Sequence, residues 1–330
     1  MHYRINVFAG RRMYSIVTGG AGFIGSNLVD ALVKRGDRIL VIDNLSAGRL
    51  ENIQKHIDSG RIQFLNADLR TQSGWEKSFA GADRVFHIAA DPDVRASAGI
   101  PKPVFESNTA ATINVLEAMR LNGVKTIVFT STSTVYGEAT VIPTPEDYSP
   151  MIPISIYAGS KLAAEAMIAS YAYTFDMRAV VFRFANIIGQ RSGHGVIWDF
   201  VHKLMNNPKE LEILGDGKQS KSYFEVSACV DAVLFAVENS KDTFNFYNIG
   251  SEDWISVTEL AEIVVSEMKL SDVKFRYTGG TRGWVGDVPK MQLSVDKLKA
   301  LGWKPTTTSK ESVRSAVKIL LDELHYFRTE

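Results

Sequence analysis

The stretch Thr18-Gly19-Gly20-Ala21-Gly22-Phe23-Ile24-Gly25 decides the fold of this chain. It follows an apolar run that is typical of a buried strand, and it precedes an amphipathic run that begins at Ser26. Glycines at this spacing allow a tight turn, a close approach of the backbone to a pyrophosphate, and packing of the helix on the strand. The helix N-terminus then presents free amides to the phosphates. The stretch therefore predicts a phosphate-binding turn made by Gly19, Gly22, Phe23, Ile24 and Gly25.

Short apolar runs alternate with helical runs from residue 14 onward. Strands are predicted at 14–18, 38–42, 62–66, 84–87, 126–130 and 179–183, with helical runs at 26–35, 75–79, 104–121 and 155–175. Because the strands are nearly continuous in Val and Ile, they favour a parallel sheet covered on both faces. We therefore expect an α/β fold, a doubly wound parallel sheet of the Rossmann type, over residues 13–185.

The alternation becomes irregular after about residue 190, where Gly, Ser, Asn and Pro are frequent. Strands are predicted at 223–226 and 245–249, and helices at 257–268 and 310–324. We expect residues 186–330 to form mainly a smaller α/β substrate-binding lobe, from which later segments can return to the first domain. Residues 1–12 precede Met13 and the first strand, and we interpret them as an N-terminal appendage.

Composition excludes several classes of function. The 330 residues hold 37 Lys and Arg against 37 Asp and Glu, so the chain lacks the basic excess that binds nucleic acid or an anionic membrane. No apolar run approaches the ~20 residues that cross a bilayer. The single cysteine, Cys229, cannot close an intramolecular disulfide, which favours a reducing, cytoplasmic compartment. The six histidines and Cys229 show no metal-ligand spacing, so no metal is expected.

Asp43 closes the second predicted strand. A carboxylate at this position can accept hydrogen bonds from the hydroxyls of an adenosine ribose and would repel a 2′-phosphate. This favours NAD over NADP as the cofactor. Arg49 follows six residues later and could reach a 2′-phosphate, which keeps NADP as the alternative.

Tyr157 and Lys161 are four residues apart and therefore lie on one face of a helix. A nearby cation favours phenolate, so we expect Tyr157 to act as a base well below its ordinary pKa of about 10. Upstream, four consecutive hydroxyl residues at 131–134 follow the strand that ends near Thr130. The carboxyl edge of a parallel sheet is where ligands bind, so these hydroxyls are expected in the same crevice.

These residues resemble those of the extended short-chain dehydrogenase/reductase superfamily and, within it, the UDP-glucose 4-epimerase group of NAD-dependent nucleotide-sugar epimerases and dehydratases. The matching motifs run nearly from end to end of the chain, at 18–25, 43–46, 68–69, 87–90, 108, 131–137, 157–161, 183–186, 214–217, 286–288 and 301–305.

The resemblance implies a role for each matching residue. Tyr157 would exchange a proton with the sugar hydroxyl, Thr132 would hydrogen-bond the same oxygen, and Lys161 would bind the nicotinamide ribose and lower the pKa of Tyr157. The cofactor-binding set implied beside the glycines, Tyr157 and Lys161 is Asp43, Asn44, Asp68, Leu69, Ala89, Ala90 and Asn108. The substrate-binding set implied beside Thr132 and Tyr157 is Asn186, His194, Lys221, Arg282 and Asp287, of which His194 and Lys221 could equally be solvated surface residues.

The implied activity is reversible hydride transfer at C4 of UDP-glucose and UDP-galactose through a 4-keto intermediate. Dehydratases and decarboxylases of the superfamily carry an acidic residue after the catalytic Thr, where this chain has Ser133 and Thr134, and elimination needs such an acid. The alternatives are an epimerase or dehydrogenase of another nucleotide sugar, for example a UDP-N-acetylhexosamine, and, more remotely, a non-catalytic nucleotide-sensing protein. One departure from the family pattern lies in the second lobe, where Ser227 and Ala228 stand at positions at which many relatives carry two Asp residues.

A homodimer is also expected, because this superfamily pairs helices of two subunits. The apolar faces that carry Val115, Met119, Ala164 and Ile168 could form such an interface. They could equally be covered within one chain.

Overall fold

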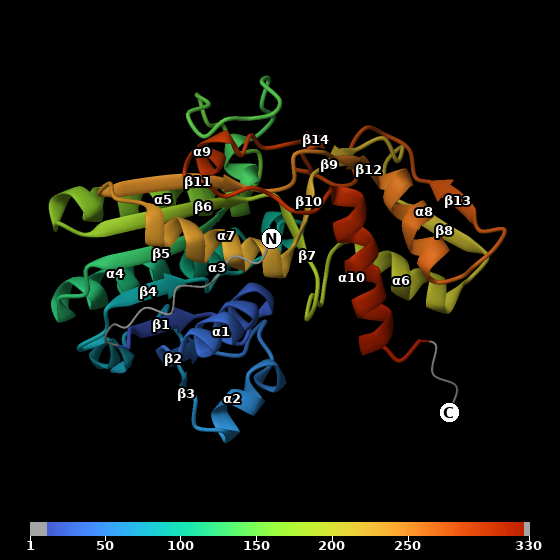
Figure 1. Cartoon of the computed structure of the whole chain (residues 1–330). Coiled ribbons are helices and arrows are strands. Elements are labelled where there is room, and N and C mark those ends of the chain that lie inside the picture. Colours follow the sequence, from blue (N-terminus) through green and yellow to red (C-terminus); the bar gives the residue numbers. More distant parts are fainter. Residues whose placement is uncertain (1–11, 327–330) are drawn as a thin grey trace.

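A seven-stranded parallel sheet forms the larger part of the molecule (Figure 1). The structure is a computed structural model and describes residues 12–326, so residues 1–11 of the predicted appendage lie outside the described residues. The strand order is β11-β6-β5-β4-β1-β2-β3. Their bounds are β1 Tyr14–Thr18, β2 Arg38–Asp43, β3 Ile62–Asn66, β4 Arg84–His87, β5 Thr126–Thr132, β6 Arg178–Phe184 and β11 Phe244–Ile249.

Helices cover both faces of this sheet, as strands with two apolar faces require. On one face α1 (Phe23–Arg35) and α7 (Val226–Asn239) pack over strand residues such as Val17 and Val180. On the other face α4 (Ala111–Asn122) and α5 (Ile156–Thr174) pack over strand residues such as Ile16 and Val181. The predicted doubly wound fold is confirmed.

The four residues considered for a dimer interface belong to the core of the chain. Val115 and Met119 of α4, and Ala164 and Ile168 of α5, are all fully buried between these helices and the sheet. An interface built on them is therefore ruled out, and the second of the two interpretations is correct. The homodimer itself stays a prediction.

The predicted helix at 104–121 is divided in three. The structure has α3 (Pro101–Phe105), a π-helical turn at Glu106–Ala110 and then α4. Asn108 lies inside the π turn and hydrogen-bonds outside its own helix, which accounts for the extra residue in the turn. The run at 75–79 is a 3₁₀ turn (Trp75–Phe79) rather than an α-helix, and α2 (Gln54–Asp58) is a single turn before β3.

The smaller part of the molecule has its own core. Apolar side chains of α6 (Val196–Asn206), α8 (Val257–Glu267) and α10 (Ser309–Glu323) pack together there with those of β8 (Glu210–Ile213). The remaining short strands are β7 Asn186–Ile188, β9 Ser220–Lys221, β10 Tyr223–Glu225, β12 Ile255–Ser256, β13 Lys274–Tyr277 and β14 Lys290–Met291.

The chain passes from one part of the molecule to the other more than once. After residue 185, α7 and β11 return to the larger sheet, and α9 (Asp296–Ala300) packs beside β11 (Figure 1). The division into domains near residue 185 therefore stays a prediction.

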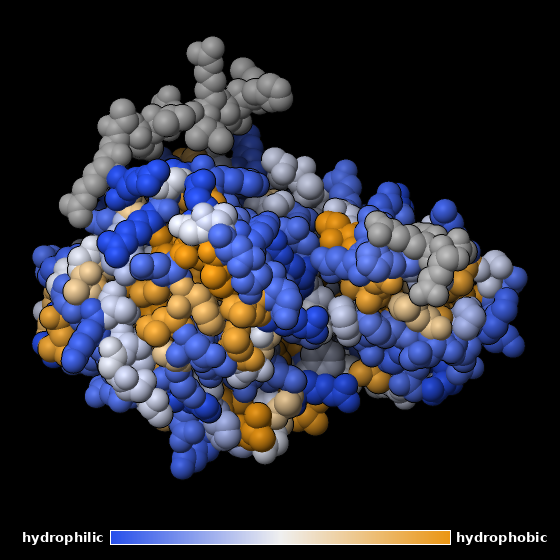
Figure 2. All heavy atoms as spheres, turned by 90° about the horizontal axis from the view of Figure 1, so that it is seen from below, coloured by the Kyte–Doolittle hydropathy of each residue, from blue (hydrophilic) through white to orange (hydrophobic). Residues whose placement is uncertain are grey.

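The outer surface is mixed in character. On the face shown in Figure 2, hydrophobic residues gather over the larger part of the molecule, among hydrophilic neighbours. Across residues 12–326, none of the helices combines the length and the apolar character that spanning a membrane requires.

Candidate functional site

Two glycines of the first turn bring α1 against β1. Gly19 has a φ of +70°, and a β-carbon on it would lie 2.6 Å from the backbone nitrogen of Ala89. A β-carbon on Gly25 would lie 2.1 Å from the carbonyl oxygen of Gly19. Both positions therefore exclude any side chain. Gly22 precedes α1 with an extended backbone, and no side chain caps the helix there, so the first turn of the helix can face an anion.

Asp43 lies beside this turn at the carboxyl end of β2. Its carboxylate is 8% exposed and accepts hydrogen bonds from the backbone N–H groups of Ala21 (3.0 Å) and Leu45 (2.8 Å). These bonds fix a negative charge next to the glycines, where the predicted ribose contact requires it. The glycine turn and this carboxylate fit a dinucleotide without a 2′-phosphate.

The residues expected around the adenine occupy the neighbouring loops. Asp68 pairs with Arg70, whose Nη2 lies 2.6 Å from Oδ2, and this pair lowers the pKa of Asp68. Asn44 also hydrogen-bonds Asp68, while Leu69 is buried and its carbonyl accepts a hydrogen bond from Asn114. The structure thus brings Asn44, Asp68 and Leu69 to one edge of the sheet, next to Asp43.

His87 fixes the next strand end from inside the protein. Its Nδ1 lies 2.7 Å from Oγ1 of Thr18 and its Nε2 lies 2.9 Å from Oγ1 of Thr112. Complete burial lowers the pKa of His87 to about 3, so the ring is neutral. Ala89 and Ala90 follow it, and the N–H of Ala89 points to Thr18 at 3.4 Å. Ala89 therefore lies against Gly19 of the glycine turn, and a cofactor contact stays a prediction for both alanines.

Asn108 connects the loop after β4 with α5 rather than standing free in a crevice. Its Oδ1 accepts from the N–H of Asp91 at 2.7 Å, and its Nδ2 donates to Oγ of Ser160 at 3.0 Å. These bonds position the segment after β4 against α5. A contact with the cofactor stays a prediction for this residue.

The three predicted catalytic residues meet where β5 ends and α5 begins. Ser155 caps α5, so Tyr157 stands on the first turn, where its phenol interacts with the Thr132 side chain at the end of β5. Lys161 lies one turn further, is 2% exposed, and donates from Nζ to the carbonyl oxygen of Thr130 at 2.9 Å. Oγ1 of Thr132 also accepts from the N–H of Thr134 at 3.2 Å.

The electrostatics of this group differ from the sequence prediction. Burial raises the pKa of Tyr157 to about 12, Asp91 acts in the same direction, and the hydrogen bond with Thr132 opposes it. Burial lowers the pKa of Lys161 to about 7. The predicted low pKa of Tyr157 is therefore wrong in this structure, because desolvation of the phenol dominates while the ammonium of Lys161 is turned to a strand carbonyl.

Three of the predicted substrate residues form one cluster in the smaller part of the molecule. Nζ of Lys221 lies 2.6 Å from Oδ1 of Asp287 and 5.0 Å from the centre of the Trp284 ring. Arg282 donates from Nη1 to the carbonyl oxygen of Asp287 at 2.6 Å. Its Nη2 reaches Glu138, in the segment after β5, at 2.6 Å. Glu138 was missed from the sequence, because no local pattern connects it with Arg282, 144 positions away.

The remaining two predicted substrate residues lie outside this cluster. Asn186 begins β7 and donates to the carbonyl oxygen of Ser222 at 3.1 Å, so it ties β7 to the strands that carry Lys221. His194 is exposed in the turn before α6, where its carbonyl accepts from Ser192. Nothing in its surroundings connects it with Thr132, Tyr157 or Lys161.

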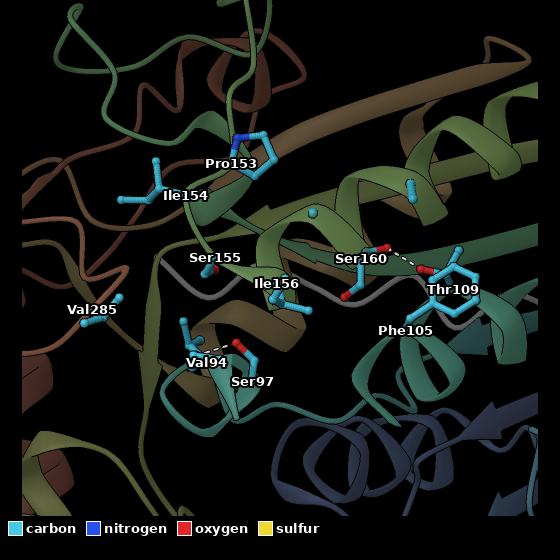
Figure 3. A pocket seen from close by; sticks show the side chains of 13 residues that line it. Val94, Ser97, Phe105, Thr109, Pro153, Ile154, Ser155, Ile156, Ser160 and Val285 are labelled. Carbon is cyan, nitrogen blue, oxygen red and sulfur yellow. Dashed lines mark hydrogen bonds between the residues drawn. The ribbon is translucent and has the colours of Figure 1, made fainter. Parts of the chain in front are cut away.

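A pocket of about 540 Å³ opens next to the first turn of α5 (Figure 3). Its wall includes Ser97, whose Oγ accepts from the N–H of Tyr157 at 3.4 Å, and Val285, which comes from the smaller part of the molecule. Figure 3 shows Val94 and Ser97 below Ser155 and Ile156, with Val285 beside them. The volume is in the range of small-molecule sites. Among residues 12–326, no group of three or more His, Cys, Asp or Glu is arranged to hold a metal ion.

Comparison with known families gives the same assignment. The model of the NAD dependent epimerase/dehydratase family matches residues 15–250, which is most of the chain. The chain belongs to this family. The resemblance inferred from the sequence is confirmed, and with it the use of NAD. A putative UDP-glucose 4-epimerase of Methanocaldococcus jannaschii is 33% identical to this chain over 317 residues. The match covers 92% of this chain and 96% of that protein.

Two further relatives show how the family varies. The crystal structure of a UDP-galactose 4-epimerase has a TM-score of 0.84 and 44% identity, and covers 94% of this family member and 100% of that chain. UDP-arabinose 4-epimerase 1 of Arabidopsis thaliana is 31% identical over 333 residues, which cover 91% of this family member and 78% of that protein. Relatives within this family therefore differ in the sugar for which they are named.

The glycine turn predicts a specific defect in cofactor retention. Replacing Gly25 with Ala places a β-carbon against the Gly19 carbonyl, so α1 must shift away from β1. We expect the purified variant to hold at least tenfold less NAD than the wild type, measured as nucleotide released on denaturation. Gly99→Ala is the control, because its β-carbon would make only an ordinary contact at 3.5 Å. Equal NAD content in Gly25→Ala and the wild type would contradict this role.

Asp43 predicts the choice between NAD and NADP. Asp43→Asn keeps an oxygen for the Ala21 N–H but removes the negative charge. We expect NAD to bind about tenfold more weakly, a loss of ~1.4 kcal/mol, and NADP to bind better than it does to the wild type. Calorimetric titration of protein stripped of nucleotide measures both. If Asp43→Asn bound NAD and NADP with the same ratio of affinities as the wild type, the predicted contact of Asp43 with the ribose would be contradicted.

Proposed function

We propose that this protein interconverts UDP-glucose and UDP-galactose by reversible oxidation and reduction at C4 of the sugar. The observation that carries the proposal is the interaction of the Tyr157 phenol with the Thr132 side chain, with hydroxyl residues rather than acids at 133 and 134. A phenol and a hydroxyl can share one sugar oxygen, whereas elimination of water needs a further acid. The choice of sugar is supported by the named 4-epimerases among the relatives.

The residues that would hold NAD are the glycine turn for the pyrophosphate, Asp43 for the adenosine ribose, and Lys161 for the nicotinamide ribose. When bound, NAD supplies the oxidation and the reduction of the sugar carbon. The protein must hold this cofactor firmly, because it is regenerated in each cycle. The close contact of α1 with β1 serves that requirement.

Tyr157 is the residue that would move the proton. Its raised pKa means that it carries a proton at neutral pH in this structure. To accept the proton of a sugar hydroxyl, the phenol must first be brought closer to ionisation, and the ammonium of Lys161, one helical turn away, is the charge available for this. Thr132 holds the phenol oxygen at the strand end while the proton moves.

The cluster of Lys221, Arg282 and Asp287 would bind the UDP part of the substrate. It carries two cations and a buried carboxylate at the side of the smaller lobe that faces Glu138. Binding energy from this remote group can orient the sugar while the sugar itself makes few fixed contacts. The cytoplasmic location and the homodimer predicted from the sequence stay part of this proposal.

The activity is tested most simply by proton NMR of UDP-galactose with the purified protein and no added NAD. We expect the anomeric signal of UDP-glucose to grow until an equilibrium mixture is reached. UDP-arabinose, UDP-N-acetylglucosamine and UDP-glucuronic acid are run in parallel. If only one of these three sugars were converted and UDP-galactose were not, that sugar would replace the proposed substrate. If none of the four were converted, the proposed epimerase activity would be contradicted.

Tyr157→Phe tests the proton transfer. It removes one hydroxyl and leaves the ring in place, so we expect kcat to fall at least 100-fold while KM and bound NAD change little. Tyr171→Phe on the same helix is the matched control, because its hydroxyl bonds Glu117 outside the site. Turnover that survives in Tyr157→Phe at the wild-type rate would rule out this mechanism.

Arg282→Gln tests the UDP site. We expect KM to rise about tenfold, which corresponds to ~1.4 kcal/mol of lost binding, with a smaller effect on kcat. Arg276→Gln removes a comparable surface ion pair with Glu210 and Glu212 in the same lobe and should leave KM unchanged. Equal KM values for the two variants would contradict the assignment.

A further inference from the structure

A buried carboxylate that the proposed mechanism does not use lies one helical turn after Lys161. Glu165 is 4% exposed on the inner face of α5. One of its oxygens accepts a hydrogen bond from Oγ of Ser131 on β5. The other lies 2.7 Å from Nη2 and 3.1 Å from Nε of Arg183 on β6. Glu165 is therefore held in one orientation by two neighbouring strands.

The partner of Glu165 is itself fixed by a buried network. Arg183 donates from Nη1 to the hydroxyl of Tyr136 and to the carbonyl oxygen of Glu146, both at 2.9 Å. The hydroxyl of Tyr136 donates in turn to Oδ1 of Asn248 on β11, at 2.8 Å. The network thus continues from α5 through β6 to the edge of the sheet. A carboxylate held by such a network cannot easily turn away or become hydrated.

Glu165 can act on the catalytic residues in two ways. It lies four residues after Lys161, so the two side chains share one face of α5 and their charges attract. It also binds Ser131, which directly precedes Thr132, so it holds the end of β5 against α5. The first effect acts on Lys161, and the second acts on Thr132, the residue that interacts with Tyr157.

We propose that Glu165 is a positioning residue of this site, whose carboxylate keeps the ammonium of Lys161 charged and anchors the strand end that presents Thr132. This inference rests on the proposed function for the role of Lys161. The attraction between the Glu165 carboxylate and the Lys161 ammonium can, however, be measured without turnover of a substrate.

The charged and titratable groups that face Lys161 come from several elements. Tyr157 and Glu165 stand on α5 itself, and β5 supplies the carbonyl of Thr130 and the ring of Phe129, 4.7 Å from Nζ. From β4, His87 interacts with Lys161 and is neutral. From β6, Arg183 acts through its pair with Glu165.

Among these groups, Glu165 is the one whose negative charge opposes the loss of the proton from Lys161, beside the Thr130 carbonyl and the Phe129 ring, which also favour the ammonium. Burial lowers the pKa of Lys161 to about 7, and the negative charge of Glu165 raises it. Removing that charge must therefore lower the pKa of Lys161 further. Lys161 would then lose its proton at a more acidic pH than in the wild type.

The experiment is a pH titration of the holoenzyme, as purified with its nucleotide, with ¹³C-labelled lysines followed by NMR. Lys161→Arg assigns the signal. In Glu165→Gln we expect the midpoint of Lys161 to lie at least one pH unit below that of the wild type. Glu117→Gln, which removes a carboxylate paired with Arg120 on α4, should leave the midpoint unchanged. Equal midpoints in Glu165→Gln and the wild type would overturn the proposal.

Glu165→Gln leaves Arg183 buried without its partner and could fail to fold, so a second pair of variants tests the same charge. Arg183→Lys and Arg183→Lys/Glu165→Gln both keep a cation at 183, which holds a carboxylate at 165 ionised, and they differ in the charge at 165. We expect the double variant to have the lower Lys161 midpoint, again by at least one pH unit. Identical midpoints in this pair would also overturn the proposal.

Ser131→Ala separates the two effects. It should lower kcat at least fivefold with less than a twofold change in KM, and leave the midpoint of Lys161 where it is in the wild type. A wild-type kcat in Ser131→Ala would contradict the proposal that Glu165 anchors the end of β5 through Ser131. If no UDP-sugar is turned over, the proposed function fails, whereas the NMR titration still decides the role of Glu165.

Discussion

A buried ammonium is the constraint on which this site depends. Lys161 is 2% exposed, and a charge taken out of water is unstable unless the protein compensates for it. The compensation comes from the Thr130 carbonyl, the Phe129 ring and the charge of Glu165. The first two require β5 and α5 to pack closely, and the hydrogen bond of Ser131 to Glu165 joins the third to the same strand. The same packing brings Tyr157 to Thr132, so the environment of the lysine and the geometry of the catalytic pair have one structural origin.

The parallel sheet places the two ends of the site at the same edge. β1 lies between β2 and β4, and the carboxyl ends of these strands carry the glycine turn, Asp43 and the loop after His87. The end of β5, next in the sheet, carries Thr132. The strand order predicts a binding crevice at this edge, because the chain runs from β1 to β2 and β3 on one side and then crosses to β4 on the other. The smaller lobe adds Lys221, Arg282 and Asp287, and Arg282 joins this cluster to Glu138 in the segment after β5.

Much of this could be predicted from the sequence, and the successes share a cause. The glycine turn, Asp43 and the pair Tyr157 and Lys161 are local patterns, in which spacing alone fixes relative position. The contact of Glu138 with Arg282 and the network of Glu165 with Arg183 join distant segments, for which one sequence holds no signal. The error on the pKa of Tyr157 has the same origin, because spacing reveals a nearby cation but not the burial of the phenol or the carbonyl that holds Lys161.

The measurement that tests the central claim most directly uses UDP-galactose carrying deuterium at C4. The account requires that the hydrogen removed from C4 stays within the protein and returns to the same carbon. We therefore predict that the UDP-glucose formed in ordinary water retains the deuterium at C4, as read by mass spectrometry and NMR. Product that carries hydrogen from the solvent at C4 would contradict oxidation and reduction at that carbon with a retained cofactor.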